Sequence, residues 1–304
     1  MTPRIFIDGE AGTTGLQIRQ RLAGRADLTV VSIAEEQRKD VAARREMLNA
    51  ADLVILCLPD EAAREAVQLV ENPAVRVIDA STAHRTAAGW TYGFPEMSQG
   101  QRGAIAASKR VTNPGCYATG FIALVRPLVE AGLLPRDGAV TAHAVSGYTG
   151  GGKAMIAEFE AGGPAFRAYA LGRRHKHVPE MQAHAGLARP PLFAPSVGRF
   201  AQGMIVEVPL PGAPSVVDVH RALAEAYAGE AFVEVASLAE TAAVTELQPE
   251  SLNRTNRMKL HVFGQGDPGQ ARLIAVLDNL GKGASGAAVQ NLNLMLGLPE
   301  SAGL

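Results

Sequence analysis

Cys116 is the residue of this sequence best placed to act as a nucleophile. An apolar stretch ends in the turn signal Asn113-Pro-Gly115, and Cys116 stands directly before an apolar, helix-patterned run over residues 117–131. Unpaired backbone N–H groups and the positive end of a helix dipole favour the reactive thiolate over the thiol. The sequence therefore predicts a nucleophile here, with a small buried residue at a helix start as the alternative.

Two histidines and a carboxylate lie together in the one basic cluster of the chain. Residues 172–180 read Gly-Arg-Arg-His-Lys-His-Val-Pro-Glu and supply His175, His177 and Glu180. An imidazole exchanges protons near neutral pH, and Glu180 could orient one of the two rings, although the spacing does not say which. Ordinary surface histidines and a nucleic-acid contact are the alternatives, and the short run without aromatic residues argues against the second.

A glycine turn near the N-terminus has the pattern of a dinucleotide site. An apolar strand over residues 4–8 runs into the turn 9–15, Gly-Glu-Ala-Gly-Thr-Thr-Gly, and an amphipathic helix is expected over 16–23. Glycines let the backbone approach a pyrophosphate, and the helix N-terminus offers N–H groups to it. The spacing is GxxGxxG and not GxGxxG, so a turn without a ligand is the alternative. The residues expected to bind cofactor here are Gly9, Gly12, Thr13, Thr14 and Gly15.

The next strand favours NADP(H) over NAD. Residues 28–33 form this strand and include Ser32, and Arg38 and Lys39 follow the acidic pair 35–36. A 2′-phosphate needs hydroxyl and cationic partners, whereas NAD needs an acid for its ribose. We expect Ser32 and Arg38 to serve the phosphate, with Glu35 as a ribose acid in the alternative.

The first third of the chain alternates strands and helices, as in an α/β, Rossmann-like, doubly wound sheet. Strands are expected at 52–58 and 75–79 with a helix at 61–70 between them, and short strands at 104–107 and 111–113. Ligands of such sheets bind beyond the carboxyl ends of the strands, where Ser81 and Arg85 fall. A guanidinium fork matches a phosphoryl group, so Arg85 is a candidate phosphate ligand.

The second half predicts a separate α+β domain with a mostly antiparallel or mixed sheet. Strands are expected at 139–145, 203–208, 231–236, 259–263 and 272–277, with a helix at 216–228. A final apolar helix over 287–296 should pack back on the first domain. We therefore expect a cofactor domain over 1–115, completed by 283–304, and a catalytic, substrate and oligomerisation domain over 116–282.

Composition excludes several classes of function. The 304 residues are 47% hydrophobic with a net charge of -1, so no global field attracts nucleic acid. No signal segment or membrane-spanning run is evident, which makes the cytoplasm the default location. Of the two cysteines, Cys57 lies in a buried-strand pattern and should be structural. We expect two thiols, and no Cys/His spacing fits a zinc site, so no metal is predicted.

Together these motifs resemble the N-acetyl-γ-glutamyl-phosphate reductase family, in its shorter type, within the aspartate-semialdehyde dehydrogenase-like group. The motifs span nearly the whole chain in the family's order and are Asp8–Gly15, Asp79–Arg85, Tyr92–Glu96, Asn113–Tyr117, His175–Glu180, Asp278–Gly286 and Gln290–Asn293. Ala118 replaces a common proline after the nucleophile, and Ser196 departs from a Pro-His-Leu segment of the longer type.

The resemblance implies an NADPH-dependent reductive dephosphorylation of N-acetyl-L-glutamyl 5-phosphate to the 5-semialdehyde, in cytoplasmic arginine biosynthesis, through a cysteine thioester. It implies Cys116 as the nucleophile, the 175/177 pair with Glu180 as the acid–base region, and a homodimer or homotetramer. It further implies substrate-side roles for Arg85 and Asn113, and cofactor contacts for Ser81 and Asn279.

Other functions stay open on the sequence alone. The same chemistry could act on aspartyl phosphate or on a glutamyl phosphate held by a carrier protein. A cysteine hydrolase or acyltransferase would share the thioester without a nicotinamide, and the glycine turn argues against it. A noncatalytic NADP-binding sensor would not need the thiol of Cys116.

Overall fold

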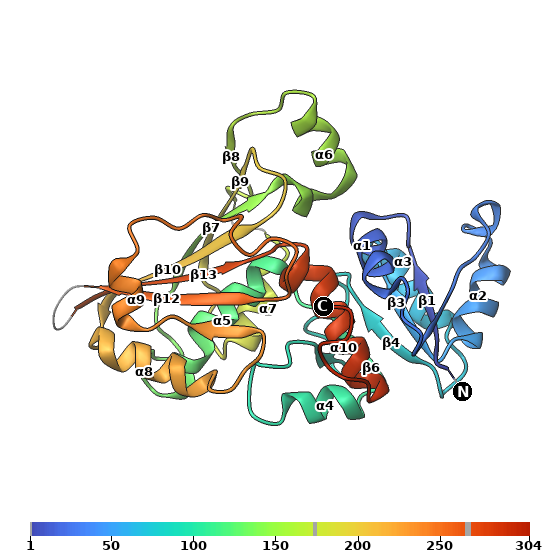
Figure 1. Cartoon of the computed structure of the whole chain (residues 1–304), viewed down its shortest axis with the longest axis horizontal. Helices are drawn as coiled ribbons and strands as arrows, with labels where there is room; N and C mark the ends of the chain where they lie inside the picture. The colour runs from blue at the N-terminus through green and yellow to red at the C-terminus, as the bar shows by residue number, and fades with distance from the viewer. Residues whose placement is uncertain (1, 173–174, 265–268) are drawn as a thin grey trace. The chain divides into compact units, whose positions relative to one another are not determined.

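The computed structural model describes residues 2–172, 175–264 and 269–304, which divide into two compact units. Unit 1 comprises Met1–Pro95, Gln99–Pro114 and Ala284–Leu304. Unit 2 comprises Glu96–Ser98 and Gly115–Gly283. Each has its own sheet (Figure 1).

Unit 1 is built on a six-stranded, wholly parallel sheet in the order β2-β1-β3-β4-β6-β5. The order runs outward in both directions from β1 and β3, which confirms the predicted doubly wound, Rossmann-like arrangement. Its strands are β1 Arg4–Asp8, β2 Thr29–Val31, β3 Leu53–Leu56, β4 Arg76–Asp79, β5 Thr91–Tyr92 and β6 Arg110–Thr112. Its helices are α1 Thr13–Leu22, α2 Val41–Ala50, α3 Asp60–Leu69, α4 Gln101–Ala107 and α10 Gly286–Leu296, with a 3₁₀ turn η1 Glu35–Gln37.

Apolar side chains fill both faces of this sheet. Successive residues of a strand point to opposite faces, and in β1 Ile5 and Ile7 join one core cluster while Phe6 joins another. The first cluster also includes Val289 and Leu292 of α10, so the C-terminal helix is part of the unit 1 core. Burial on both faces explains why the strands read as continuous apolar runs.

One element of unit 1 was predicted wrongly. Residues 104–107 belong to α4 and are not a strand. The short run Ala-Ile-Ala-Ala fits either a buried strand or one turn of helix, and alanine favours the helix because it loses no side-chain entropy there. Gly100, at a φ of 85°, makes the turn that starts the helix, and Ile105 is its buried anchor.

Unit 2 holds a seven-stranded mixed sheet in the order β11-β12-β13-β10-β7-β9-β8, which confirms the predicted second domain type. The pairs β7–β9 and β11–β12 are parallel, and the others are antiparallel. Its strands are β7 Thr141–Gly147, β8 Phe166–Ala168, β9 Leu192–Gly198, β10 Met204–Ala213, β11 Val233–Val235, β12 Met258–Gly264 and β13 Gly269–Leu277. Its helices are α5 Cys116–Glu130, α6 Gly152–Glu160, α7 Val178–His184, α8 Val216–Ala226 and α9 Leu238–Ala243, with a 3₁₀ turn η2 Tyr148–Gly151. A π-helical turn, η3 Gly281–Ser285, closes the unit.

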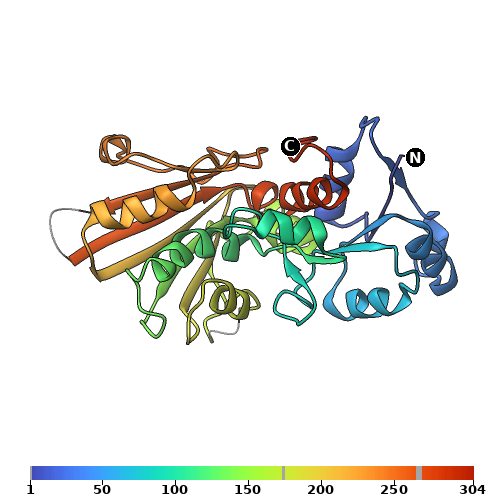
Figure 2. The ribbon, with the colours of Figure 1, turned by 90° about the horizontal axis from the view of Figure 1, so that it is seen from below.

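Helix α5 lies against the centre of this sheet, as Figures 1 and 2 show. Its backbone approaches β10 closely at Gly120, where a Cβ atom would lie 2.9 Å from a methyl group of Val206. Most of the helix is buried, so its first residue is held in a fixed place. No helix in the described part of the chain is both long and apolar enough to cross a membrane.

Candidate functional site

Cys116 is the first residue of α5, as the turn signal and the apolar run after it predicted. Gly115 caps the helix, and its backbone N–H donates to Oε2 of Glu180 at 3.1 Å. On another side, η3 passes so close that a Cβ atom on Gly283 would lie 2.7 Å from Cβ of Cys116. The carboxylate of Glu180 on one side and the backbone of η3 on the other therefore hold the turn from which the thiol projects.

Glu180 links the nucleophile turn to an imidazole. It lies in α7, is 1% exposed, and places Oε1 at 3.8 Å from Nε2 of His177. His177 is itself buried directly before α7. At 3.8 Å the two groups are farther apart than in a hydrogen bond, and the carboxylate faces the ring as a possible ion-pair partner. Cys116, His177 and Glu180 thus belong to one cluster within unit 2.

His175 serves a different set of contacts. Its Nδ1 accepts the backbone N–H of His177 at 3.1 Å, and its Nε2 lies 3.2 Å from the hydroxyl of Tyr169. A neutral ring whose Nδ1 accepts carries its proton on Nε2, which then donates to Tyr169. Tyr169 donates to the hydroxyl of Tyr117 at 3.3 Å, and Tyr117 donates to the carbonyl of Ser196 at 2.9 Å. His175 is therefore the head of a directed hydrogen-bond chain.

Burial keeps both phenols of this chain protonated. It raises the pKa of Tyr169 to about 12, and it raises the pKa of Tyr117 further. The two hydroxyls accordingly act as fixed donors near neutral pH and not as proton carriers.

The glycine turn of unit 1 has the geometry of a phosphate cradle. Gly9 has a φ of 87°, and a Cβ atom there would lie 2.3 Å from the carbonyl oxygen of Cys57. A Cβ atom on Gly15 would lie 2.6 Å from the carbonyl oxygen of Gly9, so glycine is required at both positions. Gly12 caps α1, which begins at Thr13, earlier than predicted. The first N–H groups of α1 come from the predicted run 13–15, where a bound phosphate finds donors.

Ser32 and Arg38 lie near each other in unit 1 and share a third partner. Both contact the carboxylate of Glu10, at 3.0 Å from Ser32 Oγ and 3.2 Å from Arg38 Nη2. Arg19 of α1 reaches the same carboxylate and lies 2.6 Å from Ser32 Oγ. A hollow of about 350 Å³ adjoins them, lined in part by Gly9, Glu10 and Arg38. The charged residues of its lining are three cations, Arg38, Lys39 and Arg44, and three acids, Asp8, Glu10 and Glu65.

Arg85 and Asn113 organise the turn that leads to Cys116. Arg85 is buried, and its Nε and Nη2 donate to the carbonyls of Asn113 and Ala80 at 3.0 and 3.3 Å. The amide of Asn113 donates to the carbonyl of Ala284 and accepts from Asn291. These bonds tie β4, β6 and the C-terminal segment of unit 1 together at the carboxyl ends of the strands.

Ser81 and Asn279 lie in different units. Ser81, at the end of β4, bonds the buried carboxylate of Asp79 through both its hydroxyl and its N–H, at 2.8 and 2.9 Å. Asn279 belongs to unit 2, where its amide accepts from the N–H of Gly203 and donates to the hydroxyl of Thr149. It thereby holds the glycine-rich segment after β7, which forms η2 and the start of α6.

Cys57 has the structural role that its sequence context predicted. It follows β3, and burial together with the nearby carboxylates of Asp79 and Asp8 raises the pKa of its thiol to about 12. A thiol of this kind does not ionise near neutral pH and is not a nucleophile. The predicted division between one structural and one candidate catalytic cysteine is therefore consistent with their surroundings.

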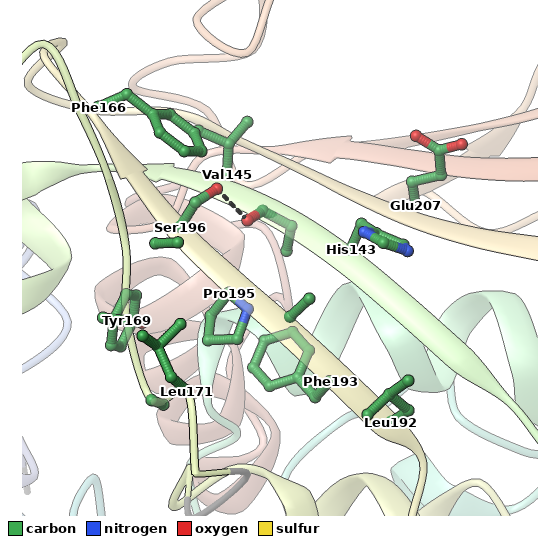
Figure 3. A pocket seen from close by; sticks show the side chains of 14 residues that line it. His143, Val145, Phe166, Tyr169, Leu171, Leu192, Phe193, Pro195, Ser196 and Glu207 are labelled. Atoms are coloured by element: carbon green, nitrogen blue, oxygen red, sulfur yellow. Dashed lines mark hydrogen bonds between the residues drawn. The ribbon is translucent and has the colours of Figure 1, made fainter.

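A large pocket lies along β7, β8 and β9 of unit 2. It has a volume of about 520 Å³, and Figure 3 shows His143 and Glu207 toward one end and Tyr169 and Leu171 toward the other. A second hollow of about 400 Å³ shares Glu207 with it. Val145 and Leu192 line the pocket on the sheet face turned away from α5. We call this surface, with His143 and Glu207, the open face.

The sequence interpretation missed several residues of these clusters. They are Glu10, Arg19, Tyr117, Tyr169 and Gly283. Glu10 and Tyr117 stand inside motifs that were singled out, so proximity to Gly9 and Cys116 was the available signal. Arg19 and Tyr169 carry no such signal, because only the fold brings them to Ser32 and His175.

Comparison with known proteins agrees with this geometry. The family model described as the semialdehyde dehydrogenase NAD binding domain matches residues 4–105, and the one described as its dimerisation domain matches 116–279. Aspartate semialdehyde dehydrogenase II of Vibrio cholerae is similar in fold, with a TM-score of 0.73 at 16% identity, covering 97% of this chain and 98% of its own. Unit 1 accordingly carries a nicotinamide-cofactor domain.

Curated relatives are similar over nearly their whole length. A protein of Brucella ovis named N-acetyl-gamma-glutamyl-phosphate reductase is 57% identical, covering 98% of this chain and all of its own length. One of Burkholderia ambifaria with the same name is 55% identical over 98% of both chains. Such relatives are oxidoreductases, and they confirm the resemblance that the motifs carried. The chain therefore belongs to the N-acetyl-γ-glutamyl-phosphate reductase family.

Proposed function

We propose that this protein reduces N-acetyl-L-glutamyl 5-phosphate to N-acetyl-L-glutamate 5-semialdehyde with NADPH, releasing phosphate, as a cytoplasmic step of arginine biosynthesis. The observation that carries the proposal is the carboxylate of Glu180, which holds the N–H of Gly115 before Cys116 and also faces Nε2 of His177. This arrangement supports acyl transfer to a thiol beside an imidazole. The names of the curated relatives support the substrate.

In the acylation step, the Cys116 thiolate attacks the acyl carbon and phosphate leaves. The N-terminus of α5 stabilises the thiolate before the attack, and backbone N–H groups of its first turn are candidate donors to the oxyanion. When bound, the nicotinamide cofactor supplies the hydride that reduces the resulting thioester. The aldehyde is released when the thiohemiacetal loses its hydroxyl proton and the thiolate departs.

We assign the proton transfers to His177. Its neighbour His175 uses Nδ1 for the N–H of His177 and Nε2 for the hydroxyl of Tyr169, so its proton position is set by structure. His177 faces the carboxylate of Glu180, the partner that an acid–base imidazole needs. His175 is a positioning residue in this proposal, because its Nδ1 holds the backbone of His177.

The cofactor assignment to NADP(H) rests on the cations beside Ser32. Arg19 donates to the hydroxyl of Ser32, and Ser32 and Arg38 both donate to the carboxylate of Glu10. Guanidinium and hydroxyl groups of this kind bind a 2′-phosphate. The glycine turn 9–15 and the start of α1 would hold the pyrophosphate. Ser81 and Asn279 stay proposed cofactor contacts.

Arg85 and Asn113 stay proposed on the substrate side. The hydrogen bond from Arg85 Nε to the Asn113 carbonyl also stabilises the turn before Cys116. Loss of Arg85 should therefore affect both the use of acyl phosphate and the placement of the nucleophile.

We propose that two copies pair through the open face of unit 2, as a homodimer or as part of a homotetramer. Two exposed apolar side chains, Phe166 and Leu192, line its pocket, and a free sheet face of this kind is costly to leave in water. The description of the family model over 116–279 as a dimerisation domain supports an interface within unit 2.

The direct test of the proposed reaction runs it in reverse. Multiple turnovers of N-acetyl-L-glutamate 5-semialdehyde with NADP⁺ should require phosphate, and NADP⁺ should be preferred to NAD⁺ by about 100-fold in kcat/KM, a 2.7 kcal/mol preference. L-aspartate 4-semialdehyde and a carrier-linked glutamate semialdehyde are the matched substrates for the two nearest alternatives. Turnover of either at a higher kcat/KM would contradict the substrate proposed here.

A further inference from the structure

The carboxylate of Glu10 occupies the centre of the cation cluster that serves the proposed 2′-phosphate. Glu10 belongs to the glycine turn and is only 8% exposed. Its Oε2 accepts from Arg19 and from Ser32, and its Oε1 accepts from Arg38. Each of the three groups expected to bind the phosphate is therefore already bonded to an anion that belongs to the protein.

These bonds and a phosphate compete for the same donors. Each guanidinium has five N–H groups, of which those on Arg19 Nη1 and Arg38 Nη2 now point at Glu10, and the one O–H of Ser32 does so too. A phosphate at this site and the carboxylate of Glu10 are two anions beside the same cations, so they repel each other. Arrival of the phosphate therefore weakens the hold of Glu10 on Arg19 and Arg38, while Arg38 also keeps its contact with Glu35 at 3.6 Å.

We propose that Glu10 is an internal anion that holds the 2′-phosphate subsite in the absence of cofactor and weakens the binding of that phosphate. The inference rests on the proposed use of NADP(H), and it names Glu10 as the residue that sets the affinity for the 2′-phosphate. In the free protein, Glu10 neutralises two cations that would otherwise repel each other beside Ser32. In the complex, the phosphate takes its place as their counter-ion.

The test uses two adenine nucleotides that separate the 2′-phosphate from the rest of the cofactor. Binding of adenosine 2′,5′-bisphosphate and of adenosine 5′-monophosphate is measured by calorimetry on the full chain, for the native protein, Glu10→Gln and Glu10→Ala. Glu36→Gln is the matched control, because it removes the same charge from an exposed position in the adjacent turn η1. Thermal melting of each variant checks that it is folded.

Both Glu10 variants should bind the bisphosphate about tenfold more tightly than the native chain does, with little change for the monophosphate. Glu36→Gln should change neither affinity by more than about twofold, since an exposed charge is screened. The native chain could prefer the bisphosphate while the Glu10 variants bind it no more tightly than the native chain does. That result would overturn this inference and leave the proposed cofactor standing. Equal binding of the two nucleotides by the native chain and by both variants would overturn the proposed cofactor and this inference together.

Discussion

The two histidines of the basic cluster differ in what their rings contact. His177 faces Glu180, whereas His175 stands at the head of the chain through Tyr169 and Tyr117 to the Ser196 carbonyl. Spacing along the chain could not separate them, because it does not show that Tyr169, six residues before His175, turns its hydroxyl to that ring, or that Tyr117 of α5 continues the chain. The fold supplies the distinction that the sequence left open.

Replacing each histidine should therefore give different kinetic results. His177→Asn should lower kcat by at least about 100-fold and remove the ionisation of the acid–base group from the pH profile, because general acid–base catalysis contributes factors of this size. His175→Asn should lower kcat less and keep the shape of the profile. Steady-state rates between pH 5.5 and 9 measure both.

Tyr169→Phe is the control for the hydrogen-bond chain. The pKa of Tyr169 is raised to about 12 by burial, so its phenol does not titrate in this pH range and its loss should leave the profile's shape unchanged. If His177→Asn and the native chain had pH profiles of kcat with the same shape, the assignment of the proton transfers to His177 would be refuted.

At the scale of elements, Cys116, the proposed nucleophile, is held where α5 meets the π-helical turn η3. Lys282 of η3 forms a fully buried ion pair with Glu96 at 2.7 Å, which fixes the turn within unit 2. The next residue, Gly283, lies against Cys116. A side chain at 283 would push the turn or the thiol out of place.

Gly283→Ala should lower kcat by about 100-fold or more while NADPH binding changes little, since displacements near 1 Å cost this much in catalysis. Gly103→Ala in α4 is the control, because a Cβ atom there meets no other atom within 4 Å and alanine favours a helix. It should be neutral or slightly stabilising. Full activity of Gly283→Ala would mean that η3 does not position the thiol.

The elements themselves were mostly predictable, because periodicity and turn residues report local structure. Helix α5, strands β1 to β4 and β6 of unit 1 and the final helix followed from apolar patterns and from glycine and proline, whereas β5, β8 and β9 were not predicted. The failures have physical causes. Residues 104–107 are too short for periodicity to choose between helix and strand, and α2 lacks a strong apolar stripe. Glu10 looked like a turn residue because its partner Arg38 is brought to it only by the fold of unit 1.

At the scale of the whole molecule, the proposed dimer gives the open face of unit 2 a partner. Leu192 is 49% exposed, and Val145 lines the same pocket. In a monomer this surface would leave apolar groups in water. Pairing would bury them, and each Å² of apolar surface removed from water would stabilise the dimer by about 25 cal/mol. Solubility and assembly should then depend on the same few side chains.

Val145→Asp combined with Leu192→Asp should convert the protein to a monomer at micromolar concentration, because an unpaired buried charge is costly. Val217→Asp on α8 is the matched control, since Val217 is similarly exposed but belongs to a helix outside the open face. Light scattering after gel filtration measures the mass. An unchanged dimer in the double variant would place the interface elsewhere.

The central claim is that the acyl group passes through Cys116, and a single-turnover measurement tests it most directly. Without phosphate, N-acetyl-L-glutamate 5-semialdehyde and NADP⁺ should give a burst of about one NADPH per active site, because the thioester then has no phosphate to accept its acyl group. Cys116→Ala should bind NADPH normally and give no burst. A burst of equal size in Cys116→Ala would contradict the account.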